Sequence, residues 1–287
     1  MSIGIAGIRL GHWSDIERAT GCTVLTLPEG TVASAEVRGG APASRELDAL
    51  SPDKTLASVD AILLTGGSAF GLAAADGVMR YLEENGRGVM TPGGRVPIVP
   101  TLALFDLGAG DPAARPTAEH GYAAARASTE EQVTHGRIGA GTGAFTAHWR
   151  GPDLRRPGGI AYAQRRLGDL TVGALCVVNA FGDIDDGSGE IALDAVAMLA
   201  QPFEFAESRT HTTIGAVVTN ARLDKMGCFI AAQGAHDGLA RALTPPHTRF
   251  DGDGFIAAAT GETEADIDTV RLMALAAVTE AIRSLAA

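Results

Sequence analysis

Apolar and polar positions along the chain predict a mixed α/β protein. Short apolar runs rich in β-branched residues predict strands at residues 8–12, 21–27, 32–38, 61–65, 212–221 and 255–259, and two more within 160–178. Apolar residues three or four apart predict helices at residues 68–85, 116–128, 224–242 and 263–278. Residues 88–115 are proline-rich and extended, residues 187–189 fit a hairpin-type turn, and the polar residues 200–210 fit an exposed linker.

Length and charge narrow the class of protein. The chain has 287 residues, of which 46% are hydrophobic, so it can bury a large core. Because no linker or repeat divides it, we expect a single domain, 1–287. The formal net charge is −11 without a basic stripe, which argues against nucleic acid or an anionic membrane as partner.

Localisation and cofactors follow from what the sequence lacks. The N-terminus has no basic region before an apolar run, and no stretch reaches the roughly 18 apolar residues of a membrane span, so we expect a cytoplasmic protein. Cys22, Cys176 and Cys228 are far apart and have mostly apolar neighbours. They fit buried thiols better than disulfides or metal ligands, and we expect no metal and no cofactor.

A glycine turn at residues 65–71 separates a buried strand from a helix whose cap is expected at Ser68. Such a turn can hold an anion or a carbonyl oxygen. Its spacing fits neither the phosphate-loop nor the dinucleotide pattern, so nucleotide binding is not favoured. A second glycine turn covers residues 139–143.

Two segments near the C-terminus carry candidate chemistry. Thr212 and Thr213 open an apolar strand, but threonine is a good strand former, so spacing alone predicts only the start of a strand. Asp251 and Asp253 are two residues apart, so in extended structure both project to one face. Unaided, this Asp-Gly-Asp sequence fits a solvated turn, or a calcium-loop fragment that lacks the rest of the pattern.

These segments belong to a longer series that resembles the self-processing aminopeptidase family. That family includes the L-aminopeptidase/D-amino-acid esterase, the β-peptidyl aminopeptidases and the nylon-oligomer hydrolase. The matching motifs lie, in the same order, at residues 64–72, 95–100, 104–108, 139–143, 172–179, 211–221, 235–242 and 246–253. The resemblance covers nearly the whole chain. It implies a four-layer αββα sandwich like that of N-terminal-nucleophile hydrolases, and a homo-oligomer such as a tetramer.

The resemblance also implies how the chain matures. Self-cleavage between His211 and Thr212 would give chains 1–211 and 212–287, and Thr212 would become the N-terminal nucleophile. A threonine hydroxyl is a weak nucleophile until a base takes its proton. The freed α-amine, with a pKa near 8, is a usable base at working pH.

The remaining site residues come from the same resemblance. Asn179 would face the oxyanion, with backbone amides of residues 139–143 adding to it, although an asparagine after a strand is more commonly a turn cap. Asp251 and Asp253 would orient the nucleophile and shuttle protons.

Two positions depart from the family pattern. His211 stands where relatives commonly have asparagine, and His148 stands where they often have lysine. His148 would serve as a cationic partner only where the imidazole is protonated, near or below pH 6.5. His236 and His247 lie in matching motifs, where a structural role is the commoner one.

The expected function is that of an N-terminal-threonine amidohydrolase acting on peptides or peptide-like amides with a free amine. The alternative is an unprocessed, non-catalytic protein that binds a small molecule in the same cavity, and the changes at His211 and His148 keep it open. The sequence leaves the substrate open among α-peptides, β-peptides, D-residues, pantetheine-like amides and nylon oligomers.

Overall fold

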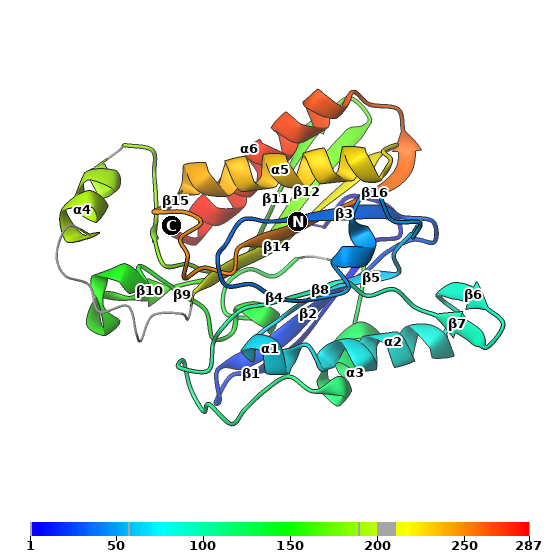
Figure 1. Ribbon diagram of the computed structural model, residues 1–287, viewed down its shortest axis with the longest axis horizontal. Coiled ribbons are helices and arrows are strands. Elements are labelled where there is room, and N and C mark those ends of the chain that lie inside the picture. Colours follow the sequence, from blue (N-terminus) through cyan, green and yellow to red (C-terminus); the bar gives the residue numbers. More distant parts are fainter. Residues whose placement is uncertain (1, 57, 132, 189, 200–210, 287) are drawn as a thin grey trace.

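Two stacked β-sheets with helices on their outer faces make up the molecule (Figure 1). The computed structural model describes residues 2–56, 58–131, 133–188, 190–199 and 211–286. Each large sheet has five strands within these residues. The four-layer αββα sandwich that the resemblance implied is confirmed.

The first sheet has the strand order β1-β2-β5-β8-β4. Only β5 and β8 pair in parallel. Its strands are β1 (Arg9–Asp15), β2 (Thr20–Thr26), β4 (Ala43–Arg45), β5 (Ala61–Thr65) and β8 (Thr101–Ala103).

The second sheet has the order β11-β12-β14-β16-β3, and only β14 and β16 pair in parallel. Its strands are β3 (Val32–Val37), β11 (Gly159–Leu167), β12 (Leu170–Asn179), β14 (Thr212–Ala221) and β16 (Gly254–Thr263). Two-stranded ribbons are β6 (Val89–Thr91) with β7 (Gly94–Val96), β9 (Phe145–Thr146) with β10 (Arg156–Pro157), and β13 (Asp183–Ile184) with β15 (Leu243–Thr244).

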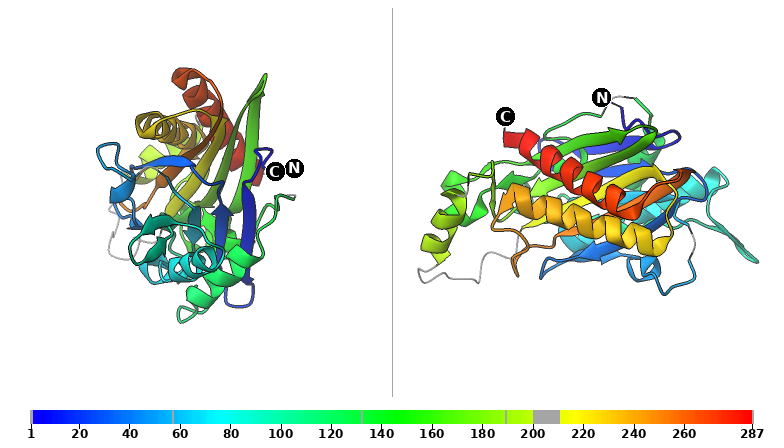
Figure 2. Two further views of the ribbon diagram at one scale, coloured as in Figure 1. Left: turned by 90° about the vertical axis from the view of Figure 1, so that its right-hand side faces the viewer. Right: turned by 90° about the horizontal axis from the view of Figure 1, so that it is seen from above.

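The helices cover the two outer faces. Helices α5 (Lys225–Ala242) and α6 (Ile267–Arg283) lie side by side across the second sheet (Figure 2). Helices α2 (Ala74–Glu84) and α3 (Ala118–Arg126) cover the first sheet. Two further helices are α1 (Ser68–Gly71) and α4 (Glu190–Leu199), and α4 lies at one end of the sandwich (Figure 1).

Three apolar layers hold the sandwich together. Alternate residues of β14 fall on opposite faces, so Ile214 packs between the two sheets while Val217 packs against α5 and α6. The third layer joins the first sheet to α2 and α3. Burying apolar side chains on both faces of each sheet explains why the predicted strands read as continuous apolar runs.

Close approach of α2 and α3 depends on glycine. A Cβ atom at Gly77 would lie 1.6 Å from the carbonyl oxygen of Ala118, and one at Gly121 would lie 1.9 Å from that of Ala74. The two backbones therefore touch where any larger side chain would separate them.

Some expectations from sequence need correction. The helix expected from residue 68 to 85 is interrupted after α1 and resumes as α2, and its N-cap is Gly67, with φ of +80°, instead of Ser68. The turn at residues 187–188 does not close a hairpin, because β13 pairs with the distant β15 and α4 follows it. The linker expected at 200–210 lies outside the described residues. Over the described part of the chain, no helix has the length and apolar character needed to cross a membrane.

Candidate active site

Strand pairing brings the predicted site residues together at one end of the three central strands of the second sheet. Strands β14 and β16 run in parallel, so Thr212 at the start of β14 lies beside Asp253, which directly precedes β16. Strand β12 runs the other way and places its last residue, Asn179, opposite Thr212. Sequence motifs more than 30 residues apart thus converge on one site.

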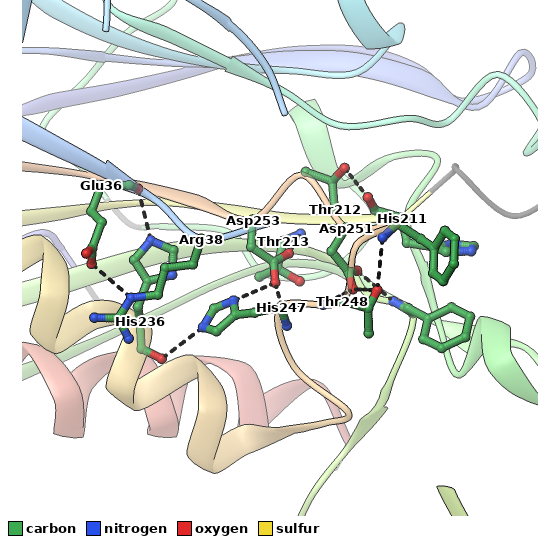
Figure 3. Close-up of polar contacts among 12 residues, drawn as sticks. Glu36, Arg38, His211, Thr212, Thr213, His236, His247, Thr248, Asp251 and Asp253 are labelled. Carbon is green, nitrogen blue, oxygen red and sulfur yellow. Dashed lines mark hydrogen bonds and ion pairs between the residues drawn. The ribbon is translucent and has the colours of Figure 1, made fainter. Parts of the chain in front are cut away.

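The Thr212 hydroxyl lies against the carbonyl that precedes it. Its Oγ1 donates a hydrogen bond to the carbonyl oxygen of His211 (Figure 3). The same oxygen accepts a hydrogen bond of 3.1 Å from the backbone N–H of Gly252. The His211 carbonyl is therefore polarised by a backbone donor, and the Thr212 hydroxyl lies beside the peptide bond between residues 211 and 212.

Gly252 makes this contact because it has no side chain. A Cβ atom there would lie 2.9 Å from Thr212 Oγ1 and 2.9 Å from the carbonyl oxygen of Ala41. Gly252 is a site residue that the sequence motifs did not single out, although its position between two aspartates was a usable signal.

Asn179 ties two loops to the site. Its Oδ1 accepts a 3.0 Å hydrogen bond from the Phe145 N–H, and its Nδ2 donates at 2.9 Å to the Phe105 carbonyl. The side chain shares a sheet face with Thr212, because directly opposed residues of an antiparallel pair project to the same side. Asn179 is thus both a structural bridge and a neighbour of the hydroxyl.

Asp251 and Asp253 hold the backbone around Thr212. Asp253 Oδ1 accepts a 2.7 Å hydrogen bond from the Thr213 N–H. Asp251 accepts from the backbone N–H groups of Phe181, at 3.2 Å, and Thr248, at 3.0 Å. In the contacts of the described residues, neither carboxylate reaches the Thr212 hydroxyl, so before cleavage their role is to position the chain.

The two carboxylates differ in their surroundings. Burial, followed by the negative charge of Asp253, raises the pKa of Asp251. Asp253 instead faces the His247 ring, whose Nδ1 lies 2.9 Å from Asp253 Oδ2. A buried carboxyl group with a raised pKa, as at Asp251, is typical of acid–base sites.

His148 lies in the site but without the charge expected of it. Its ring centroid is 4.3 Å from that of His211, and its Nδ1 lies 2.9 Å from the Ala180 carbonyl oxygen. Burial lowers the pKa of His148 to about 4, and burial followed by the charge of nearby His148 lowers the pKa of His211 to about 3. The lowered pKa of His148 disfavours the cationic form expected from sequence near or below pH 6.5, because it keeps the ring neutral there in the uncleaved chain. Because a carbonyl only accepts, Nδ1 carries the hydrogen and Nε2 holds a lone pair.

The second glycine turn is used mainly for structure. Its first two amides donate to side-chain hydroxyls, Gly139 N–H to Ser14 Oγ at 2.7 Å and Ala140 N–H to Thr23 Oγ1 at 3.0 Å. These two amides are thus not available to an oxyanion. Gly143 is the turn residue that lines the cavity described next.

A small cavity of about 70 Å³ adjoins Asn179. Its lining includes Asp106, Gly143, Phe145, His148, Arg155 and Asn179. Asp106 is the carboxylate of this cavity, and burial raises its pKa to about 6. A more open groove of about 510 Å³ lies on α6 and contains none of the predicted site residues.

Asp106 also explains the first glycine turn. Its Oδ1 accepts a 2.7 Å hydrogen bond from the Gly67 N–H, and its Oδ2 accepts one from Thr20 Oγ1 at 2.7 Å. The anion held by this turn is thus the protein's own carboxylate, in line with the sequence argument against nucleotide binding. Among the described residues, no group of three or more His, Cys, Asp or Glu side chains is placed to hold a metal ion.

The fold has known counterparts. One is the L-aminopeptidase/D-Ala-esterase/amidase from Ochrobactrum anthropi, described as a variant of the N-terminal-nucleophile hydrolase fold. Its structure superposes with a TM-score of 0.74 at 18% identity, and the match covers 99% of this chain and 84% of that one. The αββα sandwich described above is therefore the fold of an N-terminal-nucleophile hydrolase.

Sequence comparison gives the family. The model of peptidase family S58 matches residues 3–286, and the chain belongs to this family. An uncharacterised aminopeptidase of Mycobacterium leprae is 42% identical over 292 residues, covering 91% of this chain and 78% of its own length. A 6-aminohexanoate-oligomer endohydrolase of Kocuria sp. is 29% identical over 275 residues, covering 90% and 74%. The protein is thus a hydrolase of an aminopeptidase family.

Proposed function

We propose that this hydrolase cleaves itself between His211 and Thr212 and then uses Thr212 as an N-terminal nucleophile. The observation that carries the proposal is the placement of the Thr212 hydroxyl against the His211 carbonyl, whose oxygen also accepts the Gly252 N–H. Family membership supports it, because the fold is shared with N-terminal-nucleophile hydrolases.

Self-cleavage proceeds by an acyl shift. Thr212 Oγ1 bonds to the His211 carbonyl carbon, the bond to the Thr212 nitrogen breaks, and the hydroxyl proton passes to that nitrogen. Water then hydrolyses the ester, which leaves a carboxylate on His211 and a free hydroxyl and α-amine on Thr212. Thr213 fits this role less well, because its buried hydroxyl contacts no hydrogen-bond partner in the described chain and its N–H is held by Asp253.

Substrate hydrolysis uses the groups that cleavage releases. The Thr212 α-amine takes the hydroxyl proton, and the hydroxyl attacks the substrate carbonyl. The Asn179 amide faces the developing oxyanion from the opposite strand. Asp251 and Asp253 keep the start of β14 in place.

The substrate is a short peptide or peptide-like amide with a free amine. The cavity beside Asn179 is lined by Asp106, whose carboxylate would attract an ammonium group, and by Arg155, whose guanidinium would attract a carbonyl or carboxylate of the substrate. At about 70 Å³ the cavity is smaller than the roughly 300–1,000 Å³ of ligand pockets, so we expect it to enlarge after cleavage.

Hydrolysis of matched substrates tests this function. Cleaved protein should hydrolyse aminoacyl-p-nitroanilides, and N-acetylation of the substrate should abolish turnover. Asp106→Asn should raise KM for the free amine with a smaller effect on kcat, while Asp60→Asn, at another buried carboxylate outside the cavity, should not. Equal rates with free and acetylated substrates would contradict the proposed recognition of the amine.

A further inference from the structure

His247 contacts the carboxylate that holds the start of β14. Both its ring Nδ1, at 2.9 Å, and its backbone N–H, at 3.2 Å, face Asp253 Oδ2 (Figure 3). The other oxygen of Asp253 accepts the Thr213 N–H at 2.7 Å. His247 is therefore two hydrogen bonds from the residue that follows the nucleophile.

Both ring nitrogens of His247 face acceptors. Nδ1 faces a carboxylate, and Nε2 lies 3.4 Å from the carbonyl oxygen of His236. A carbonyl oxygen and an ionised carboxylate both only accept hydrogen bonds, so with Asp253 ionised the two contacts are satisfied together only when both ring nitrogens carry a hydrogen. The geometry thus favours the imidazolium form of His247 beside an ionised Asp253.

The surroundings of this pair are largely buried and include several titratable groups. His236 of α5 is fully buried, its Nε2 lies 2.9 Å from the Glu36 carbonyl oxygen, and its ring centroid is 4.8 Å from that of His247. Burial lowers the pKa of His236 to about 3, so this ring is neutral near pH 7. The titratable and charged groups that face or border the pair are Asp251 on the same turn, His236 and Asp237 on α5, and Glu36 and Arg38 at the end of β3.

The charge of His247 bears on the amine that cleavage would release. The Thr212 nitrogen belongs to the residue directly before Thr213, whose N–H Asp253 binds. An ionised carboxylate nearby raises the pKa of an amine because it stabilises the ammonium form. A cation paired with that carboxylate cancels the effect and leaves more of the amine as free base.

We propose that His247 is a positioning residue that aims Asp253 at the Thr213 N–H and, as an imidazolium, offsets its charge so that the Thr212 amine remains a base near neutral pH. The proposal rests on the proposed function of Thr212, and it assigns separate effects to the hydrogen bond and to the charge.

Two substitutions separate these effects. His247→Asn keeps a donor close to the position of Nδ1, and asparagine tolerates the left-handed backbone there, where φ is +48°. The His247→Asn variant should retain self-cleavage and most of kcat at high pH. The rising limb of its pH profile of kcat should shift to higher pH by about one pH unit. His247→Leu removes both donor and charge and should also lower the plateau of kcat. His135→Asn, at an exposed histidine outside the site, should leave the profile unchanged.

A readout independent of cleavage completes the test. In full-length Thr212→Ala protein with ¹⁵N-labelled histidine, NMR should show both His247 nitrogens protonated at pH 7. A neutral His247 in that protein, or an unshifted limb in cleaved His247→Asn, would overturn the proposal. Failure of the wild-type chain to cleave would instead count against the function of Thr212, and the NMR result would still decide the state of His247.

Discussion

The backbone N–H of Gly252 donates a 3.1 Å hydrogen bond to the carbonyl oxygen of His211. This contact joins the loop before β16 to the peptide bond at the start of β14, and it leaves no space for a side chain at Gly252. It is the most direct indication that this carbonyl is prepared for attack, because a donor is already placed where negative charge would develop.

Replacing Gly252 should therefore impair maturation. In Gly252→Ala the new methyl group would lie 2.9 Å from Thr212 Oγ1 and force the hydroxyl or the loop to move. A shift of about 1 Å can cost about 100-fold in rate, so we expect a comparable slowing of self-cleavage on a denaturing gel. Gly93→Ala is the matched control, since its Cβ would meet only Thr91 Oγ1 at 3.8 Å. Cleavage of Gly252→Ala at the wild-type rate would show that the contact is irrelevant.

Asn179 should matter for turnover beyond its structural role. Asn179→Ala should lower kcat by about two to three orders of magnitude, the typical loss for one oxyanion donor. It should also reduce thermal stability, because two hydrogen bonds to loop backbone disappear.

Asn220→Ala provides the comparison for Asn179→Ala. Asn220 lies near the far end of β14, accepts a hydrogen bond from Thr171 N–H and donates one to the Asp169 carbonyl, both at 2.8 Å. The Asn220→Ala variant should lose a similar amount of thermal stability but keep the wild-type kcat. If both variants lost the same activity, Asn179 would be only structural.

Acid should destabilise the uncleaved protein through its buried histidines. Burial lowers the pKa to about 4 for His12 and His148 and to about 3 for His211 and His236, whereas the unfolded value is 6.5. The unfolded chain therefore binds more protons than the folded chain below pH 6.5. The stability that the neutral histidines contribute is complete above pH 6.5 and is lost as the pH falls toward 4, by about 1.4 kcal/mol per histidine for each pH unit.

Two carboxyl groups act in the opposite direction. Burial raises the pKa of Asp106 to about 6 and also raises that of Asp251, so their contribution to stability grows as the pH falls. Because four histidines outnumber them, we expect the melting temperature of full-length Thr212→Ala protein to fall between pH 7 and pH 4.5. His12→Asn should flatten this dependence, and a melting temperature that rises on acidification would be inconsistent with the assigned shifts.

The pH profile of the cleaved enzyme should contain no limb from His148. The rising limb belongs to the Thr212 amine, whose pKa is expected near 8. In the uncleaved chain His148 is neutral above pH about 4, and we expect its buried surroundings to persist after cleavage, so its deprotonation should not end activity near pH 6.5. We expect His148→Asn, which keeps a donor toward the Ala180 carbonyl, to leave the position of the limb unchanged. A falling limb near pH 6.5 that vanishes in this variant would restore a cationic role for His148.

How far the sequence predicts the molecule depends on the kind of feature. The strand at Thr212 and the helix from Asp224 are visible because their apolar spacing and capping residue act locally, and the structure has them as β14 and as α5 with Asp224 as its N-cap. The parallel pairing of β14 with β16, which brings Asp253 beside Thr212, is a long-range contact that local pattern does not encode. The family resemblance implies only that Asp251 and Asp253 act on Thr212, and it leaves the strand pairing itself unpredicted.

Two features of the site were beyond the sequence argument for physical reasons. The charge of His148 depends on burial against His211, which only the folded loops produce. The contribution of Gly252 lies in a backbone N–H, which nearly every residue carries, and in close contacts with Thr212 and Ala41 that only the folded chain produces. The position of the α1 N-cap at Gly67 instead of Ser68 likewise follows from the left-handed Gly67 and its hydrogen bond to Asp106.

Intact mass spectrometry of the purified protein tests the central claim most directly. The wild-type chain and Thr213→Ala should give two fragments, residues 1–211 and 212–287, with threonine at the new N-terminus, while Thr212→Ala should remain full length. A wild-type chain that stays intact on prolonged incubation, or a Thr212→Ala chain that cleaves at the same bond, would contradict the account.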